Sequence, residues 1–188
     1  MKIVITGGPG GGKTTALDLF KRELKDAVCV VPESASAIFA SGVIRSEKFE
    51  VVKLIQKTIY DYQKNIESIY SVQNKGDILL CDRGTLDGLA YWPNSQESFF
   101  EMTGTTLEDE LKRYDAVIFF ETAAQVGGDI TSNNPFRNES NEKSIELDKK
   151  LKSIWKQHPQ FFLVRSESSF VSKIMKGIDV IHCVLGKK

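Results

Sequence analysis

Residues 7–14 read GGPGGGKT and carry the clearest chemistry in this sequence. They fit the spacing G-x-x-x-x-G-K-[ST], and the β-branched run KIVIT comes directly before them. Glycines in such a loop let consecutive backbone N–H groups converge on phosphate oxygens, and the following helix adds its N-terminal donors and the positive end of its dipole. The segment predicts a phosphate-binding loop of the Walker A type. The expected nucleotide contacts are Gly8, Gly10, Gly11, Gly12, Lys13, Thr14 and Thr15.

Lys13 and the two threonines after it extend this chemistry to the far end of a triphosphate. Lys13 is expected to bridge the β- and γ-phosphates as a point charge, and the hydroxyl of Thr14 is expected to coordinate a phosphate-bound Mg²⁺. Thr15 mainly continues the helix. A flexible turn followed by a solvated lysine is the alternative, which the flanking strand and helix disfavour. ATP is the expected nucleotide, and GTP stays open.

Two further groups of polar residues come at the ends of apolar runs. Residues 27–31 (AVCVV) lead to Glu33, and residues 78–81 (ILLC) lead to Asp82 and Arg83. Such runs are typical of strands buried on both faces of a parallel sheet, and ligands bind at the carboxyl edge of these sheets. Asp82 is predicted to be the Walker B acid beside Mg²⁺, and Arg83 to clamp a phosphoryl group or hold an acceptor. An exposed Glu33 and a purely structural Asp82–Arg83 pair are the alternatives.

Residues 122–141 show no clear period and gather glycine, asparagine and proline. A loop of this length in a compact domain is usually a lid or a binding loop. Arg137 is its only cation and is the candidate to close over a transferring phosphoryl group. A bare surface arginine is the alternative.

Residues 85–105 are also irregular and contain Asp87 and several aromatic side chains. Aromatic rings near the phosphate edge can stack on a nucleobase, and packing beneath a loop is an equally good explanation. Asp87 is a candidate for binding acceptor hydroxyls, although an acid in the first turn of a helix has the same appearance in a sequence. His158 is expected to be a helix-end residue rather than a base.

The elements that must position these residues are strands alternating with helices. Strands are expected near residues 2, 27, 78, 115 and 160, which predicts an α/β fold with a five-stranded parallel sheet and helices on both faces. Residues 48–73 are expected to form one long helix. Its core-facing stripe is predicted to be Val51, Ile55, Ile59, Tyr62, Ile66 and Ile69, and its solvated face Lys53, Lys57, Lys64 and Glu67. Residues 1–188 are expected to be one domain.

Composition limits the function classes. The 25 Lys and Arg residues balance the 25 Asp and Glu residues. This balance gives no indication of a basic surface that would bind nucleic acid. The three cysteines form no C-x-x-C pair, which fits a reducing, cytoplasmic setting. No apolar run reaches the roughly 18 residues of a spanning helix, so no integral membrane segment is expected. Peripheral contact with a phosphoinositide stays open.

Two groups of motifs resemble known families. GGPGGGKT with VVPE and CDRG is similar to the nucleoside and nucleotide kinase branch of the P-loop proteins. VVPESA, DRGTLDGLAYWP, RNES and EKSIELDKKLKSIWKQHP resemble more closely the small AAA-like ATP-binding family that groups nicotinamide riboside kinase domains with the TRPL translocation defect protein. This resemblance extends from Lys2 to about Val164. It implies a three-layer P-loop fold with strand order 2-3-1-4-5.

The kinase resemblance also implies roles for the candidate residues. Glu33 would accept the proton of an acceptor hydroxyl or help to hold metal, Asp82 would orient Mg²⁺, and Arg83 would contact phosphate or acceptor. The region of Arg137 would be the lid. The leading hypothesis is therefore ATP- and Mg²⁺-dependent phosphoryl transfer to an unknown small acceptor. The alternative is a regulatory module that binds ATP or GTP and controls a protein or phosphoinositide partner.

Overall fold

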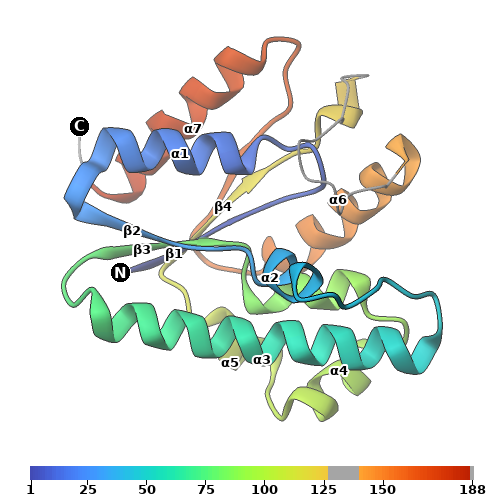
Figure 1. Ribbon diagram of the computed structural model, residues 1–188. Helices are drawn as coiled ribbons and strands as arrows, with labels where there is room; N and C mark the ends of the chain where they lie inside the picture. The colour runs from blue at the N-terminus through green and yellow to red at the C-terminus, as the bar shows by residue number, and fades with distance from the viewer. Residues whose placement is uncertain (127–139, 187–188) are drawn as a thin grey trace.

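The structure is a computed structural model that describes residues 1–126 and 140–186. Within these residues, five parallel strands form one sheet in the order β2-β3-β1-β4-β5 (Figure 1). The predicted α/β sheet and its strand order are confirmed. The strands are β1 (Lys2–Thr6), β2 (Val28–Val31), β3 (Ile78–Asp82), β4 (Ala116–Phe120) and β5 (Phe161–Val164).

Helices cover both faces of this sheet, with α1 and α7 on one side and α3 on the other (Figure 1). The α-helices are α1 (Lys13–Leu24), α2 (Ser34–Ala40), α3 (Phe49–Gln73), α4 (Gln96–Thr103), α5 (Leu107–Leu111), α6 (Asn141–Trp155) and α7 (Phe170–Val184). Short 3-10 helices are η1 (Lys25–Ala27), η2 (Thr85–Tyr91) and η3 (Ala123–Val126). The three layers bury the sheet on both faces.

Successive residues of β1 show how the strands divide the core. Ile3 and Ile5 pack with Phe20 of α1 and Ile181 of α7, whereas Val4 packs on the opposite face among residues of η2 and α6. Alternate residues of a strand point to opposite faces, so a strand between two helical layers must be apolar throughout. All five residues of β4 are buried for the same reason.

The register of the strands brings their carboxyl ends to one edge. Ile5 of β1 lies opposite Asp82 of β3, and Val31 of β2 lies opposite Cys81. The residues after β1, β2 and β3 therefore emerge side by side, as the sequence predicted. This edge carries the candidate site.

Helix α3 spans the predicted residues, but the prediction of its buried face is only partly confirmed: Ile55 is buried and Ile66 packs against the core. Its buried residues are Ile55, Gln56, Tyr60, Gln63 and Glu67. Val51, Tyr62 and Ile69, predicted to face the core, are 36%, 37% and 49% exposed, whereas Glu67, predicted to be solvated, is fully buried. Partners distant in the sequence satisfy the polar side chains of this buried face.

Glu67 accepts four hydrogen bonds, one of which comes from Gln63 in the previous turn of α3. The others come from Lys2 Nζ at 2.9 Å, Arg113 Nη2 at 2.9 Å and the Tyr114 hydroxyl at 2.7 Å. A buried carboxylate is tolerated when it is paired and hydrogen-bonded in this way. Glu67 thus ties α3 to β1 and to the segment before β4.

No helix within residues 1–126 and 140–186 is both long and apolar enough to cross a membrane.

Candidate nucleotide and acceptor site

The loop between β1 and α1 has the backbone that its glycines allow. Gly7, Gly10 and Gly12 adopt φ angles of 134°, 70° and 85°, which side chains other than glycine rarely tolerate. A Cβ at Gly7 would lie 1.9 Å from the carbonyl oxygen of Phe120. The loop therefore packs against the end of β4 with backbone atoms alone, and α1 begins directly after Gly12 with its N-terminal N–H groups. This is the geometry of an anion cradle.

Lys13 lies over this cradle. Its ammonium group donates to the carbonyl oxygens of Gly7 at 2.9 Å and Gly8 at 2.8 Å, and the residue is buried. Thr14 and Thr15 are exposed in the first turn of α1. A triphosphate in the cradle would offer Lys13 anionic acceptors, which form stronger hydrogen bonds than carbonyl groups.

Arg83 and Glu33 meet at the same edge of the sheet. The Nε of Arg83 donates to Glu33 Oε1 at 2.5 Å, and Nη1 approaches the Gly7 carbonyl oxygen at 3.4 Å. Glu33 is the N-cap residue of α2 and also accepts a hydrogen bond from the Ser36 hydroxyl. The structure thus brings together Lys13, Glu33, Asp82 and Arg83, the four candidates at strand ends and in the loop.

Burial and charge act in opposite directions on Arg83. Burial lowers the pKa of Arg83, but interactions with Tyr91, Glu33 and Asp87 outweigh burial and raise that pKa well above its ordinary value. The guanidinium is therefore a permanent positive charge beside the loop. A fixed cation at this position is suited to stabilising charge on a transferring phosphoryl group or on an acceptor.

Asp87, the candidate for binding acceptor hydroxyls, sits in a network of buried hydrogen bonds and also lines a cavity beside Arg83. Its carboxylate accepts from Arg83 Nη1 at 2.8 Å, from the Thr6 hydroxyl at 2.8 Å and from Trp155 Nε1 at 2.8 Å. It lies in the first turn of η2 and is buried. As their common acceptor, the carboxylate connects β1, η2 and α6 and holds Arg83 in place.

Asp148 is a buried carboxylate that no sequence pattern singles out. Its Oδ1 accepts from the backbone N–H of Gly8 and from that of Thr122, each at 2.9 Å. Burial raises the pKa of Asp148, and the two backbone N–H groups oppose that rise. Asp148 joins the phosphate-binding loop to the segment after β4. The contact spans 140 residues of chain, so no local pattern could reveal it.

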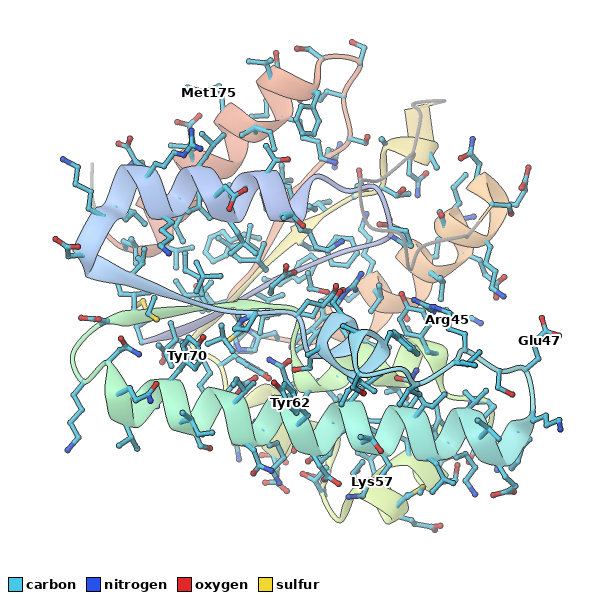
Figure 2. The ribbon with its side chains drawn as sticks, viewed as in Figure 1. Arg45, Glu47, Lys57, Tyr62, Tyr70 and Met175 are labelled. Carbon is cyan, nitrogen blue, oxygen red and sulfur yellow. The ribbon has the colours of Figure 1, made fainter. Side chains whose placement is uncertain are left out.

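A cavity adjoins Glu33 and Arg83 beside the phosphate-binding loop. It measures about 60 Å³ and is walled by α2, α3, η2 and the loop residue Pro9. A wider groove of about 670 Å³ shares Phe39, Arg45, Gln56 and Tyr91 with it. Figure 2 shows Arg45 in the segment between α2 and α3. Amide, guanidinium and aromatic groups together suit a polar ring-containing acceptor.

The aromatic residues of the irregular segment divide between this cavity and the core. Tyr91 lines the cavity. Trp92 and Phe99 are buried and pack edge to face at 5.3 Å, and Phe99 packs on Tyr60 at 6.0 Å. His158 is also structural: its ring contacts the Tyr114 carbonyl oxygen at 2.9 Å, as expected for a helix-end residue.

The predicted lid is described only at its two ends. Residues 123–126 form η3, and Ser140 caps α6 by accepting from the N–H of Lys143. Arg137 lies outside the described residues.

The loop, the sheet order and the acids at the strand ends define the class of P-loop nucleotide-binding proteins. Comparison with known families gives the narrower assignment. A family model described as an AAA domain matches residues 2–170, and the chain belongs to this family.

Two solved structures share the fold over nearly the whole chain. Thymidylate kinase from Ehrlichia chaffeensis is 16% identical, with a TM-score of 0.65 and 98% of each chain covered. Deoxyadenosine kinase from M. mycoides, solved with bound dATP, is 17% identical, with a TM-score of 0.57 and 100% of each chain covered. These likenesses show a kinase-like P-loop fold. The comparison with curated proteins found no match.

Proposed function

We propose that this protein transfers the γ-phosphoryl group of ATP, in the presence of Mg²⁺, to a small nucleoside- or nucleotide-like acceptor. The observation that carries the proposal is the Arg83–Glu33 pair, 2.5 Å apart, between the phosphate-binding loop and the cavity. Phosphoryl transfer depends mainly on positioning and on charge stabilisation. The Glu33 carboxylate can position the acceptor, and the Arg83 guanidinium can stabilise the charge on the phosphoryl group.

Each residue has a distinct role in this proposal. The loop from Gly8 to Thr15 binds the triphosphate, with Lys13 on the β- and γ-phosphates. The oxygen of the acceptor hydroxyl attacks the γ-phosphorus, and Glu33 accepts the proton that this hydroxyl loses. The bond from that phosphorus to the bridging oxygen breaks, and ADP leaves with the electron pair. Arg83 stabilises the charge on the transferring group, and Arg137 is proposed to close over it.

Thr14 and Asp82 fit a magnesium site. Thr14 is exposed beside the cradle, and Asp82 ends β3 next to Ile5. Residues 1–126 and 140–186 contain no cluster of three or more His, Cys, Asp or Glu side chains able to hold a metal. A site with few protein ligands suits Mg²⁺, because the ion keeps several waters and takes its other ligands from phosphates. Bound there, Mg²⁺ would neutralise charge on the phosphates.

The test is transfer of radiolabel from γ-labelled ATP across a panel of nucleosides and nucleoside monophosphates. Nicotinamide riboside belongs in the panel because the sequence motifs resemble those of nicotinamide riboside kinase domains. Lys13→Ala is expected to abolish transfer while leaving the fold intact, since Lys13 serves the ligand. Tight ATP binding without transfer to any acceptor would refute the kinase proposal and favour the nucleotide-dependent regulatory module.

Glu33→Gln separates two kinds of acceptor. If the acceptor is a hydroxyl group, loss of the general base is expected to lower kcat by about 10²–10⁴-fold. If the acceptor is a phosphate, which is already ionised, the loss is expected to stay below about tenfold. ATP affinity, measured by calorimetry, is the control and is expected to be unchanged.

A further inference from the structure

Gln63 is a buried residue of α3 whose side-chain amide is bonded next to both Glu33 and Arg83. The residue is 2% exposed and borders the cavity beside Arg83. Its Oε1 accepts a hydrogen bond from the hydroxyl of Ser34, which follows Glu33 and is the first residue of α2. Its Nε2 donates to the backbone carbonyl oxygen of Arg83 at 3.3 Å and to Glu67 Oε1 at 2.9 Å. One side chain therefore connects the start of α2 to the segment after β3.

Glu67 fixes the direction in which this amide points. The Glu67 carboxylate also accepts from Lys2 and Arg113, each at 2.9 Å, and an ionised carboxylate offers only acceptors. It must therefore face the NH₂ group of Gln63 rather than the oxygen. The oxygen then faces Ser34, whose hydroxyl donates to it. The amide is thereby held in a single orientation.

The backbone of Arg83 is held from two sides. Its N–H donates to the carbonyl oxygen of Ile5 in β1 at 3.0 Å, and its carbonyl oxygen accepts from Gln63 in α3. The φ angle of 73° is one that an arginine rarely adopts, so it persists only where the surrounding bonds enforce it. The backbone conformation sets the direction of the side chain. Gln63 thus helps to aim the guanidinium of Arg83 at Glu33, which lies 2.5 Å from Nε.

The same amide holds the first turn of α2. Helix α2 packs on α3 (Figure 1), and Ser34 is 2% exposed at this contact. Glu33 is the N-cap residue of α2, so its position follows that of the first turn. The hydrogen bond from Ser34 to Gln63 therefore limits where the carboxylate of Glu33 can lie.

The hydrogen bonds of Gln63 leave little capacity for a ligand. An amide NH₂ group has two N–H donors, and the Glu67 carboxylate and the Arg83 carbonyl oxygen provide one acceptor for each. The Oε1 atom already accepts from Ser34, so one of its two lone pairs remains. Although Gln63 lines the cavity, it is therefore suited to holding protein groups rather than to recognising an acceptor.

We propose that Gln63 is a positioning residue, which sets Glu33 and Arg83 relative to each other while Glu67 fixes its orientation. The catalytic consequence rests on the proposed function, because phosphoryl transfer needs the base and the cation in a defined arrangement. Gln63 acts through these two residues and not on the reacting atoms.

Gln63→Met is the main test, because methionine has a similar size and forms none of the three hydrogen bonds. A fall in kcat of at least about tenfold is expected, since a displacement of about 1 Å can cost about 10²-fold. The KM for the acceptor and the Kd for ATP should change by less than about threefold. Gln73→Met is the matched control, because Gln73 is exposed at the end of the same helix, and wild-type kinetics are expected for it.

Two other kinetic outcomes would overturn the proposal. A raised KM with unchanged kcat in Gln63→Met would make Gln63 an acceptor-binding residue. Unchanged kinetics with a lower thermal unfolding midpoint would make its role purely structural.

Ser34→Ala is a milder variant that removes only the bond to α2. It is expected to lower kcat several-fold, and less than Gln63→Met does. Adding Ser34→Ala to Gln63→Met should lower kcat no further, because both changes cut the same connection. Effects that multiply in the double variant would mean that the two residues act independently, which contradicts the proposal.

NMR of the isotope-labelled protein separates this proposal from the proposed function, because it needs neither nucleotide nor acceptor. The Nε–H signal of Arg83, assigned by its loss in Arg83→Lys, reports the bond to Glu33. Exchange of this proton with water is expected to be at least about tenfold faster in Gln63→Met, since a loosened contact opens more often, and unchanged in Gln73→Met. An unchanged rate in Gln63→Met overturns the positioning role even in an active kinase. Faster exchange in a protein that phosphorylates no acceptor supports the positioning of Arg83 and refutes only the kinase proposal.

Discussion

Arg83 is the residue that connects the two halves of the candidate site. Its φ of 73° lies in the left-handed region, which costs an arginine about 1–3 kcal/mol. The ion pairs to Glu33 and Asp87 hold it in that conformation. A guanidinium has donors on three nitrogens in a rigid fork and reaches both carboxylates at once, whereas the three donors of a lysine lie on a single nitrogen. The sequence motif predicted a functional arginine, and in the structure both ion pairs of Arg83 use the fork of its guanidinium.

Asp148 provides a prediction at the same scale. Asp148→Ala removes the acceptor from two buried backbone N–H groups, those of Gly8 and Thr122, so the free energy of unfolding is expected to fall by about 2–4 kcal/mol. The Kd for ATP should rise, because Gly8 belongs to the cradle. Urea denaturation and calorimetry measure the two effects.

Asp148→Asn is the control for that variant. An amide oxygen can accept the same two hydrogen bonds, and it avoids burying a carboxylate whose pKa burial raises. Stability and ATP affinity close to wild type are expected. Equal losses in the Ala and Asn variants would mean that the charge of Asp148, rather than its hydrogen bonds, matters.

The structure of the elements shows what the sequence could and could not predict. Each strand was predictable from its short continuous apolar run bounded by turn residues, a pattern typical of strands covered by helices. Helix α3 was predictable in extent but not in orientation. Periodicity shows which residues share a face, but it does not show which face meets the protein. The buried face holds Gln63 and Glu67, which are satisfied by partners as distant as Arg83 and Tyr114.

Helix α7 carries a prediction of pH dependence through Lys173. Burial lowers the pKa of Lys173 to about 8 from an ordinary 10.5, although Asp148 and Glu121 act in the other direction. Between these two pH values the unfolded chain binds more protons than the folded protein, so this residue's contribution to stability rises with pH. Below about pH 8 lysine is protonated in both states, and its contribution is constant.

Lys173→Met isolates this effect. Burial also raises the pKa of Cys81 and Tyr114, whose titration lowers stability as pH rises, so wild type alone would mix opposing trends. The difference in unfolding free energy, wild type minus Lys173→Met, is expected to increase from pH 8 to pH 10 and to stay level from pH 6 to pH 7. Urea denaturation across this range measures it. A difference independent of pH would mean that Lys173 titrates normally in the folded protein.

At the scale of the molecule, one backbone carbonyl lies between the proposed nucleotide site and the proposed acceptor site. The oxygen of Gly7 accepts from Lys13 at 2.9 Å and is approached by Arg83 at 3.4 Å. If Lys13 turns to a triphosphate, the Gly7 oxygen loses the hydrogen bond from Lys13 and keeps the approach of Arg83. Nucleotide binding at the loop is therefore expected to change the contacts of Arg83 beside the cavity, while the sheet edge stays rigid.

Nucleotide binding should consequently stabilise the whole fold. At about 100 times its Kd, Mg²⁺–ATP contributes about 2.7 kcal/mol, which for a chain of this size raises the unfolding midpoint by about 5–10 °C. Lys13→Ala is expected to lose most of this increase, whereas Glu33→Gln should keep it, because Glu33 faces the acceptor cavity. Thermal unfolding with and without Mg²⁺–ATP measures all three proteins. A full increase in Lys13→Ala would show that the nucleotide binds somewhere other than the loop, and loss of the increase in Glu33→Gln would move Glu33 from the acceptor to the nucleotide.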